Sequence, residues 1–237
     1  MPRRVQSHRI QRGPLRGFRI VTSWHDYPAA ILGTTEADLL AWFEKNVHTG
    51  DTWLDVGAHY GYTAIALCRL VDRTGRVFAF EPVLTTAGYL AGTKELNGLS
   101  QLTVVPFALG ADETMDLAIS STERGMATHR HPDGSATKLF VVGLDKLWPS
   151  INGDQPCVDG VKIDVQGMEY QVVMGMLRTL QQWRPKLIIE FHAGVDRHKL
   201  ISLLAGVGYN GTGIPIESAE DELGGYKDDR SYLFVHT

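Results

Sequence analysis

Five polar side chains stand where predicted strands end. Asp55, Glu81, Asp164, Glu190 and His192 each close or follow a short apolar run. Ligands of an open α/β sheet bind across the carboxyl ends of its strands. One polar residue at a strand end is weak evidence, because strand ends tolerate polar groups. Five together predict one site for binding and acid–base chemistry.

Asp55 leads into a glycine turn. Residues 53–56 are typical of a buried strand, and residues 63–71 repeat apolar side chains at helical spacing. Gly57 and Gly61 between them allow a sharp bend and leave room for a ligand against the backbone. This strand, turn and helix predict the first half of a nucleotide-binding fold. We therefore expect Gly57→Val to block the ligand without unfolding the chain.

Glu81 indicates which kind of nucleotide ligand this fold would bind. It ends the next strand, 20 positions after Gly61, where an acid accepts hydrogen bonds from ribose hydroxyls. The spacing leaves two adenosine ligands open, a dinucleotide and S-adenosylmethionine. The turn itself has Ala58 at one of the usual glycine positions, and Asp55 precedes it. A carboxylate there suits a cationic ligand better than a pyrophosphate, which favours S-adenosylmethionine.

At these residues the sequence resembles the FkbM family of class I S-adenosylmethionine-dependent methyltransferases. The matching segments are 55–63, 80–82, 107–110, 161–169 and 188–192. They lie within residues 34–214, and the run from Asp164 to Glu169 is the most specific of them. Two residues depart from the family pattern. His59 stands where Asn is usual, and Gln166 stands where Glu is usual.

The resemblance implies a cofactor site and an acceptor class. It implies O-methylation of a hydroxyl group on a sugar, a glycolipid or a secondary metabolite. In the family, the turn that carries Ala108 lies beside adenine. The implied cofactor-binding residues are Asp55, Gly57, Ala58, His59, Gly61, Tyr62, Thr63, Glu81, Pro82, Ala108, Leu109 and Asp164.

Methyl transfer to a hydroxyl group needs a base, because the oxygen must lose its proton. His192 is the first candidate, since imidazole titrates near neutrality. Its role predicts a rate that falls below a pKa near ~6.5. Asp164 is the second candidate, and Glu190 completes the predicted catalytic set. Asp164 and Glu190 also offer an oxygen-only pair that suits Mg²⁺, so a magnesium cofactor is a further hypothesis.

Helical and strand-like runs alternate through most of the chain. With the resemblance, they predict a doubly wound α/β fold with a mostly parallel, Rossmann-like sheet of seven strands. A helix is expected over 35–47, opened by the capping pattern of residues 35–38. One continuous helix is expected after Gly167. Two last strands, 209–214 and 231–235, predict a C-terminal antiparallel hairpin.

The alternation divides the chain into regions. Residues 1–33 are predicted to be a basic N-terminal arm with a short strand, and residues 34–237 the methyltransferase domain. Residues 1–19 of the arm are expected to be disordered, because they contain six arginines and no acid. Residues 110–159 are predicted to be a β-rich insertion, whose histidines at 129–131 lie on a loop. The acidic loop 215–230 suits either a lid or a solvated surface.

Composition narrows the function classes. The chain has 237 residues and a formal net charge of −4, so affinity for nucleic acid is not expected. Its two cysteines, Cys68 and Cys157, predict no disulfide framework and fit a reducing, cytoplasmic location. Neither a membrane span nor a signal-peptide pattern is found. The expected partner is a small-molecule or glycan acceptor, with a homo-oligomer left open.

Two other functions remain open from the sequence. An NAD(P)-dependent oxidoreductase fits the spacing between Gly61 and Glu81, but not Asp55, Ala58 or the terminal hairpin. A non-enzymatic module that binds S-adenosylmethionine fits the departures at His59 and Gln166.

Overall fold

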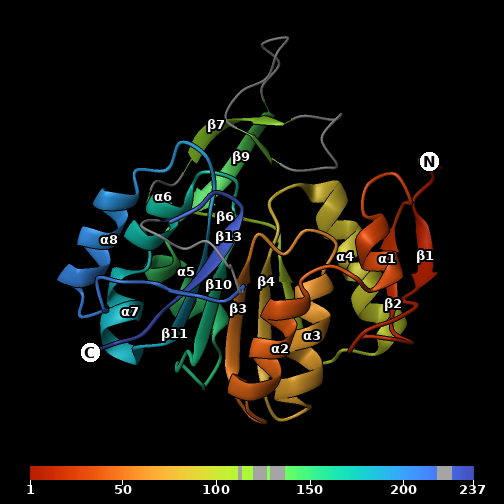
Figure 1. The fold of residues 1–237 in the computed structure, drawn as a ribbon, viewed down its shortest axis with the longest axis horizontal. Coiled ribbons are helices and arrows are strands. Elements are labelled where there is room, and N and C mark those ends of the chain that lie inside the picture. The colour runs from red at the N-terminus through yellow and green to blue at the C-terminus, as the bar shows by residue number, and fades with distance from the viewer. Residues whose placement is uncertain (112–113, 120–126, 129–136, 218–225) are drawn as a thin grey trace.

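A seven-stranded sheet forms the centre of the protein (Figure 1). The computed structural model describes residues 1–111, 114–119, 127–128, 137–217 and 226–237. The sheet order is β12-β13-β11-β10-β3-β4-β5. The strands are β3 (Thr52–Val56), β4 (Arg76–Phe80), β5 (Leu102–Val105), β10 (Gly160–Ile163), β11 (Lys186–Phe191), β12 (Ile214–Pro215) and β13 (Arg230–Phe234).

The predicted sheet is confirmed in strand number and direction. From β5 through β4, β3 and β10 to β11, neighbouring strands pair in parallel. β13 pairs antiparallel with both β11 and β12, and it lies between them. The first of the two last strands is shorter than predicted, however, whereas the second has the predicted length. Tyr209 only forms an isolated bridge with His236, and β12 begins at Ile214.

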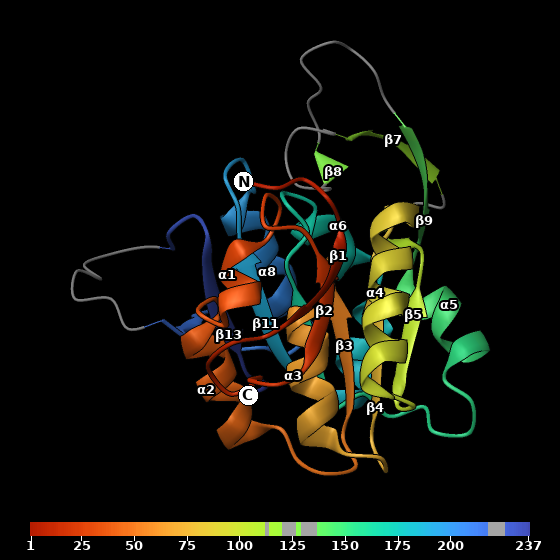
Figure 2. The same cartoon turned by 90° about the vertical axis from the view of Figure 1, so that its right-hand side faces the viewer.

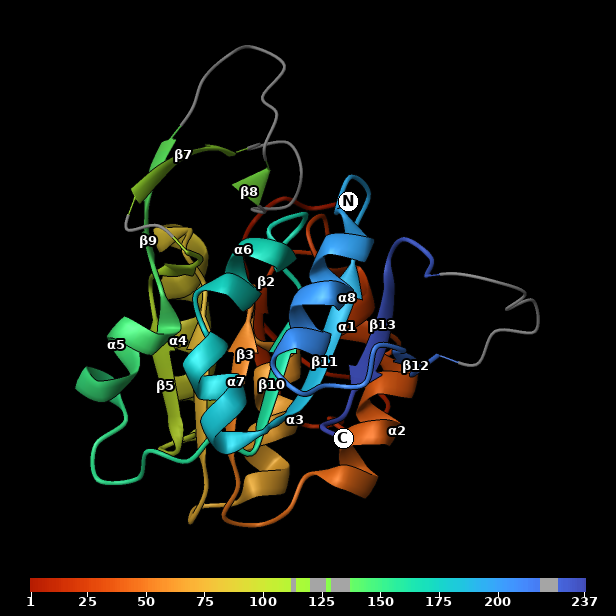
Figure 3. The same cartoon turned by 90° about the vertical axis from the view of Figure 1, so that its left-hand side faces the viewer.

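Alternating side chains bury both faces of the sheet. Trp53 of β3 belongs to one apolar core and its neighbour Leu54 to the other, and both are 0% exposed. This is the two-residue period of a strand with helices on both faces. One face carries α2 (Ala37–Asn46), α3 (Tyr62–Val71) and α4 (Leu84–Asn97). The other carries α5 (Leu144–Ile151), α6 (Glu169–Met174), α7 (Leu177–Trp183) and α8 (Arg197–Gly206), which face the viewer in Figure 3.

The helix expected after Gly167 is broken into α6 and α7 at Gly175. A Cβ on Gly175 would lie 2.2 Å from the carbonyl oxygen of Gly110, so the chain bends where the two backbones touch. The apolar stripe runs through both helices and therefore did not reveal the break. The capping pattern predicted for residues 35–38 is also wrong. Glu36 is the N-cap residue of α2, and no side chain caps that helix.

The N-terminal region is folded, which corrects the expectation of a disordered arm. β1 (Gln6–Arg9) and β2 (Arg19–Thr22) form an antiparallel pair beside α4 (Figure 2). The backbone N–H of Arg19 donates to the side-chain oxygen of Asn97 at 2.8 Å. Ile10, Leu15 and Ile20 are buried in the same core as α2 and α3. A short helix, α1 (Pro28–Leu32), follows.

The insertion forms a second, smaller sheet in the order β6-β9-β7-β8. Its strands are β6 (Ala108–Leu109), β7 (Thr114–Ile119), β8 (Ala127–Thr128) and β9 (Thr137–Val142). The histidines of residues 129–131 and residues 218–225 of the predicted lid lie outside the described residues. No helix among the residues that the structure describes is long and apolar enough to cross a membrane.

Gly57 has a structural role that the sequence interpretation missed. Its φ is +87°, and an added Cβ would lie 1.8 Å from the carbonyl oxygen of Asp164. A side chain at this position therefore collides with the neighbouring strand's backbone, so the expectation that Gly57→Val spares the fold is wrong.

We expect Gly57→Ala to lower the free energy of unfolding by about 2–4 kcal/mol, from left-handed strain and overpacking. Gly88 in α4 is the matched control, because nothing lies within 4 Å of its added Cβ. Gly88→Ala should raise stability by ~0.5–1 kcal/mol. Denaturant unfolding measures both. Equal stability of Gly57→Ala and the parent would contradict the close approach.

Candidate active site

The glycine turn and Glu81 meet at the carboxyl edge of the sheet. One carboxylate oxygen of Glu81 accepts from the backbone N–H of His59 at 3.0 Å, and the other accepts from Val83 N–H at 2.9 Å. Burial raises the pKa of Glu81 to about 7, although these two N–H groups oppose the rise. The carboxylate is thus fixed against the turn, and each oxygen keeps a further lone pair for a ligand hydroxyl.

Asp55 lies beneath the turn and is 0% exposed. It accepts a hydrogen bond from the Thr63 hydroxyl at 2.7 Å, and its other oxygen is 3.6 Å from the ammonium of Lys162. Lys162 lies directly opposite Asp55 on the neighbouring strand β10. Asp55 and Thr63 therefore bond to the protein itself. Their predicted contact with the cofactor stays a prediction.

Lys162 also reaches the acid at the end of β10. Its Nζ lies 3.1 Å from Oδ2 of Asp164, while only 3% of Lys162 is exposed. Burial alone would lower the pKa of Lys162, but the negative charges of Asp164 and Asp55 raise it. Burial would raise the pKa of Asp164, but Lys162 and His192 lower it. The result is a buried ammonium held between two carboxylates.

His192 lies in a ring of acids, of which the sequence predicted Asp164 and Glu190 but not Glu169. Its Nδ1 is 2.7 Å from Oε1 of Glu169, and its Nε2 is 3.5 Å from both Asp164 and Glu190. A side-chain amide nitrogen of Gln166 lies 2.8 Å from the same Nε2. We call Asp55, Lys162, Asp164, Gln166, Glu169, Glu190 and His192 the strand-end cluster.

These contacts correct the expected pKa of His192. Burial would lower that pKa, but hydrogen bonding to Glu169 and Glu190 and the charge of Asp164 raise it to about 10. The ring is then an imidazolium at neutral pH and cannot accept a proton. The predicted loss of rate below ~6.5 does not follow for this environment, and the base role of His192 lacks its physical basis.

The strand-end cluster was also tested for magnesium. One ligand atom each from Asp164, Glu190 and His192 lies within 4.8 Å of the others. Metal ligands must be deprotonated, however, and the imidazolium is not. Asp164 is already paired with Lys162. The carboxylates are therefore already paired with the imidazolium of His192 and the ammonium of Lys162, which does not suit a metal site. Magnesium stays a prediction that these side chains do not support.

Strained backbone gathers around the strand-end cluster. The described residues other than glycine with positive φ are Glu36, His59, Asp72, Gln166, Arg184 and Asp229. Asp72 and Arg184 end helices, but the other four lie near the cluster. Asp229 approaches His192 Nε2 at 4.0 Å, for example, and Gln166 contacts the same atom. Such strain persists where the surroundings enforce it, most often at functional sites.

The remaining predicted cofactor residues vary in their exposure. Ala58, Tyr62 and Leu109 are buried, whereas Pro82 and Ala108 are half-buried. Gly61 has φ +91°, and its added Cβ would meet Leu90 of α4 at 2.2 Å, so it serves packing as well as the turn. The structure leaves the cofactor role of these residues as a prediction.

Known proteins match this arrangement in sequence. The family described as "Methyltransferase FkbM domain" matches residues 55–210. A hexuronic acid methyltransferase, AglP, from Haloferax volcanii is 32% identical over 172 residues, which are 72% of this chain and 68% of that protein. The family match and this relative favour a methyltransferase over the oxidoreductase and over a non-enzymatic module.

Solved structures match the fold. The methyltransferase FkbM from Methylobacillus flagellatus KT superposes with a TM-score of 0.54 at 16% identity, over 89% of this chain and 53% of that chain. Fibrillarin from Aeropyrum pernix, solved with natively bound S-adenosyl-L-methionine, gives a TM-score of 0.52 at 12% identity over 98% and 99% of the two chains. These similarities establish the Rossmann-like methyltransferase architecture.

Binding of S-adenosylhomocysteine should strengthen as the pH rises through about 7, the pKa of Glu81. Ribose hydroxyls bond more strongly to the carboxylate than to the neutral acid, which predicts up to ~10-fold tighter binding at pH 8 than at pH 6. Glu81→Gln should weaken binding by ~1.5–3 kcal/mol for each charge-assisted bond lost and flatten the pH dependence. Titration calorimetry measures both, with exposed Glu95→Gln in α4 as the control. Parent-like affinity in Glu81→Gln would remove Glu81 from the cofactor site.

Exhaustive chelation is expected to leave methyl transfer unchanged, because Lys162 and the protons of His192 already satisfy the acids of the strand-end cluster. The measurement is turnover in EDTA, with and without added Mg²⁺. Loss of activity that Mg²⁺ restores would instead make Asp164 and Glu190 metal ligands.

Proposed function

This chain belongs to the FkbM family of methyltransferases, and we propose that it methylates a hydroxyl group of a sugar. Its methyl donor is S-adenosylmethionine, which supplies an activated methyl group when it is bound. The proposed class of methyl acceptor rests on the 32% identity to a hexuronic acid methyltransferase over 72% of this chain. The proposed acceptor is accordingly a sugar of the uronic acid type.

The proposed cofactor site follows the carboxyl edge of the sheet. In this proposal Glu81 accepts hydrogen bonds from ribose hydroxyls, and the two backbone N–H groups that fix its carboxylate support that role. The strand-end cluster supplies the complementary charge for the cationic methionyl end. It contains four carboxylates, Asp55, Asp164, Glu169 and Glu190, against the two cations Lys162 and His192. The remaining negative charge attracts a sulfonium ligand.

The same charge favours a hydroxyl group over a carboxylate as the methyl acceptor. A uronic acid offers both groups to the enzyme. Glu36 lies close enough to Asp164 and Glu190 for their charges to act on it, and Glu217 lies close enough to Glu190. We call Glu36, Asp164, Glu190 and Glu217 the acidic rim. The rim would repel an anionic nucleophile, whereas it would not repel a neutral hydroxyl group. The acid side chains thus support an ether product.

Location and assembly are further proposals. Both cysteines are unpaired, Cys68 buried and Cys157 exposed, which supports a reducing compartment such as the cytoplasm. A homo-oligomer also stays a prediction.

Turnover with S-adenosylmethionine labelled in the methyl group tests the proposed acceptor. Nitrophenyl β-D-glucuronide should accept label, and the matched nitrophenyl β-D-glucoside should accept less. The product should resist mild alkali, because a methyl ether is stable there and a methyl ester is not. No transfer to any sugar hydroxyl would contradict the proposal, and an alkali-labile product would assign the carboxylate as acceptor.

A further inference from the structure

Helix α2 brings an acid to the site from outside the segment that matches the family. The carbonyl oxygen of Asn46, at the end of α2, accepts from Nζ of Lys186, the first residue of β11, at 2.6 Å. The end of α2 therefore lies at the amino edge of the sheet. Ten helical residues span ~15 Å, and the five residues of β3 span ~17 Å. Glu36, which precedes α2, consequently lies level with the carboxyl edge.

Glu36 lies close enough to the strand-end cluster for the charges of Lys162, Glu190 and Asp164 to act on it. Its side chain makes no capping hydrogen bond to α2, and its φ is 56°. Burial raises its pKa to about 7; Lys162 opposes the rise, and the charges of Glu190, Asp164 and Glu217 add to it. The side chain is half-buried, so a ligand can reach it.

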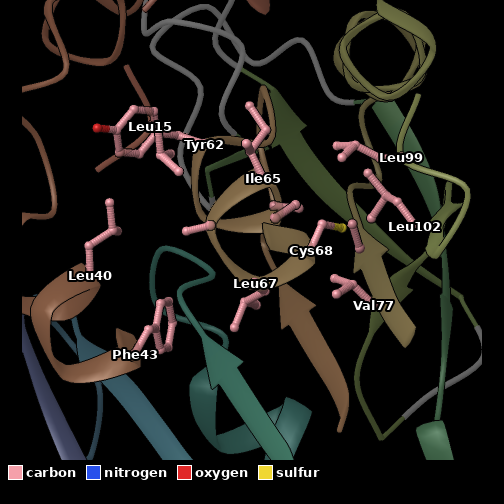
Figure 4. Close-up of a cluster of buried hydrophobic side chains, with 14 of the residues drawn as sticks. Leu15, Leu40, Phe43, Tyr62, Ile65, Leu67, Cys68, Val77, Leu99 and Leu102 are labelled. Carbon is pink, nitrogen blue, oxygen red and sulfur yellow. The ribbon is translucent and has the colours of Figure 1, made fainter. Parts of the chain in front are cut away.

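Two tyrosines border the same carboxylate. Burial and the charge of Glu36 both raise the pKa of Tyr27 and of Tyr62. The Tyr62 hydroxyl is buried without a hydrogen-bond partner among the described residues, and only 2% of the residue is exposed. In Figure 4 this oxygen points away from the apolar side chains around it. A buried hydroxyl without a partner is costly, so it points to a polar ligand group as the missing partner.

The other candidate bases are poorly matched to proton transfer from a hydroxyl group. His192 already carries its proton near neutral pH, and Lys162 lowers the pKa of Asp164. A general base works best when its pKa lies near the working pH. Among the acids of the rim, Glu36 meets that condition without an ammonium bonded to it.

We propose that Glu36 is the general base that takes the proton from the acceptor hydroxyl. This inference rests on the proposed O-methylation. The O–H bond breaks as its proton moves to the Glu36 carboxylate, and the oxygen forms a bond to the methyl carbon. The methyl–sulfur bond breaks and its electron pair stays on sulfur. The products are the methyl ether, the neutral thioether S-adenosylhomocysteine and protonated Glu36, which then releases its proton to water.

Two substitutions separate this role from a structural one. Glu36→Gln keeps size and shape, and it should lower kcat by ~10²–10⁴-fold with cofactor affinity unchanged. With the cofactor saturating, so that the titration of Glu81 does not limit binding, parent turnover of nitrophenyl β-D-glucuronide should rise with pH through about 7, and Glu36→Gln should lose that titration. Glu36→Gly suits the positive φ, so it should melt no lower than the parent. Added formate should restore part of its turnover by replacing the missing carboxylate.

Glu44→Gln is the matched control, because Glu44 lies on the exposed face of α2 and pairs with Arg69 away from the cluster. It should keep parent turnover. Near-parent turnover and an unchanged pH profile in Glu36→Gln would overturn the base role while the proposed function stands. A parent enzyme that forms an alkali-labile ester, or that methylates no sugar hydroxyl, would overturn the proposed function and the base role together.

Discussion

The ammonium of Lys162 is the interaction on which the site depends. It lies between Asp55 and Asp164, which come from neighbouring strands and would repel each other without it. A buried ion pair that loses one partner typically costs ~3–5 kcal/mol, because the remaining charge has no solvent. Lys162 therefore lowers the pKa of Asp164 and opposes the rise that burial causes in the pKa of Asp55. Asp55 supports the turn through Thr63, and Asp164 reaches the ring of acids around His192.

The identity of residue 166 matters for the charge of that ring. The family usually has Glu at this position, and this chain has Gln166 against Nε2 of His192. A carboxylate there would be the fourth acid around one imidazole, beside Asp164, Glu169 and Glu190. With its oxygen turned toward the protonated Nε2, the amide accepts a hydrogen bond, and it removes a full negative charge. The cluster thus stays negative enough for a cationic cofactor without adding another buried acid that lacks a cation.

Local patterns predicted the parts of the fold that depend on local chemistry. The glycine turn, the alternation of helices and strands and the placement of Glu81 beside the turn all followed from spacing. Lys162 was missed, because a lysine within a strand gives no sign that both of its partners are acids. The pKa of His192 was missed because Glu169, which contacts its Nδ1, reaches it only in three dimensions. Glu36 belongs to no motif that indicates catalysis, so its position near the site was not predicted. That position follows only from the packing of α2.

The N-terminal hairpin shows that amino-acid composition alone does not predict whether a segment folds. Its arginines suggested disorder, but Ile10, Leu15 and Ile20 are spaced so that each enters the core while the charged side chains stay outside. Three well-placed apolar residues and the hydrogen bonds to α4 outweighed the average composition of the segment.

The position of β13 has a consequence for how the enzyme is made. β13 follows every other strand of the sheet in the chain, yet it lies inside the sheet, between β11 and β12. A nascent chain on the ribosome can therefore pair β3, β4, β5, β10 and β11 before β13 has been synthesised. Until then, the strand that carries Glu190 has an open edge, which is a template for pairing with other chains. The edge of the sheet at the strand that carries Glu190 is therefore completed last, and the chain is open to wrong pairing until then.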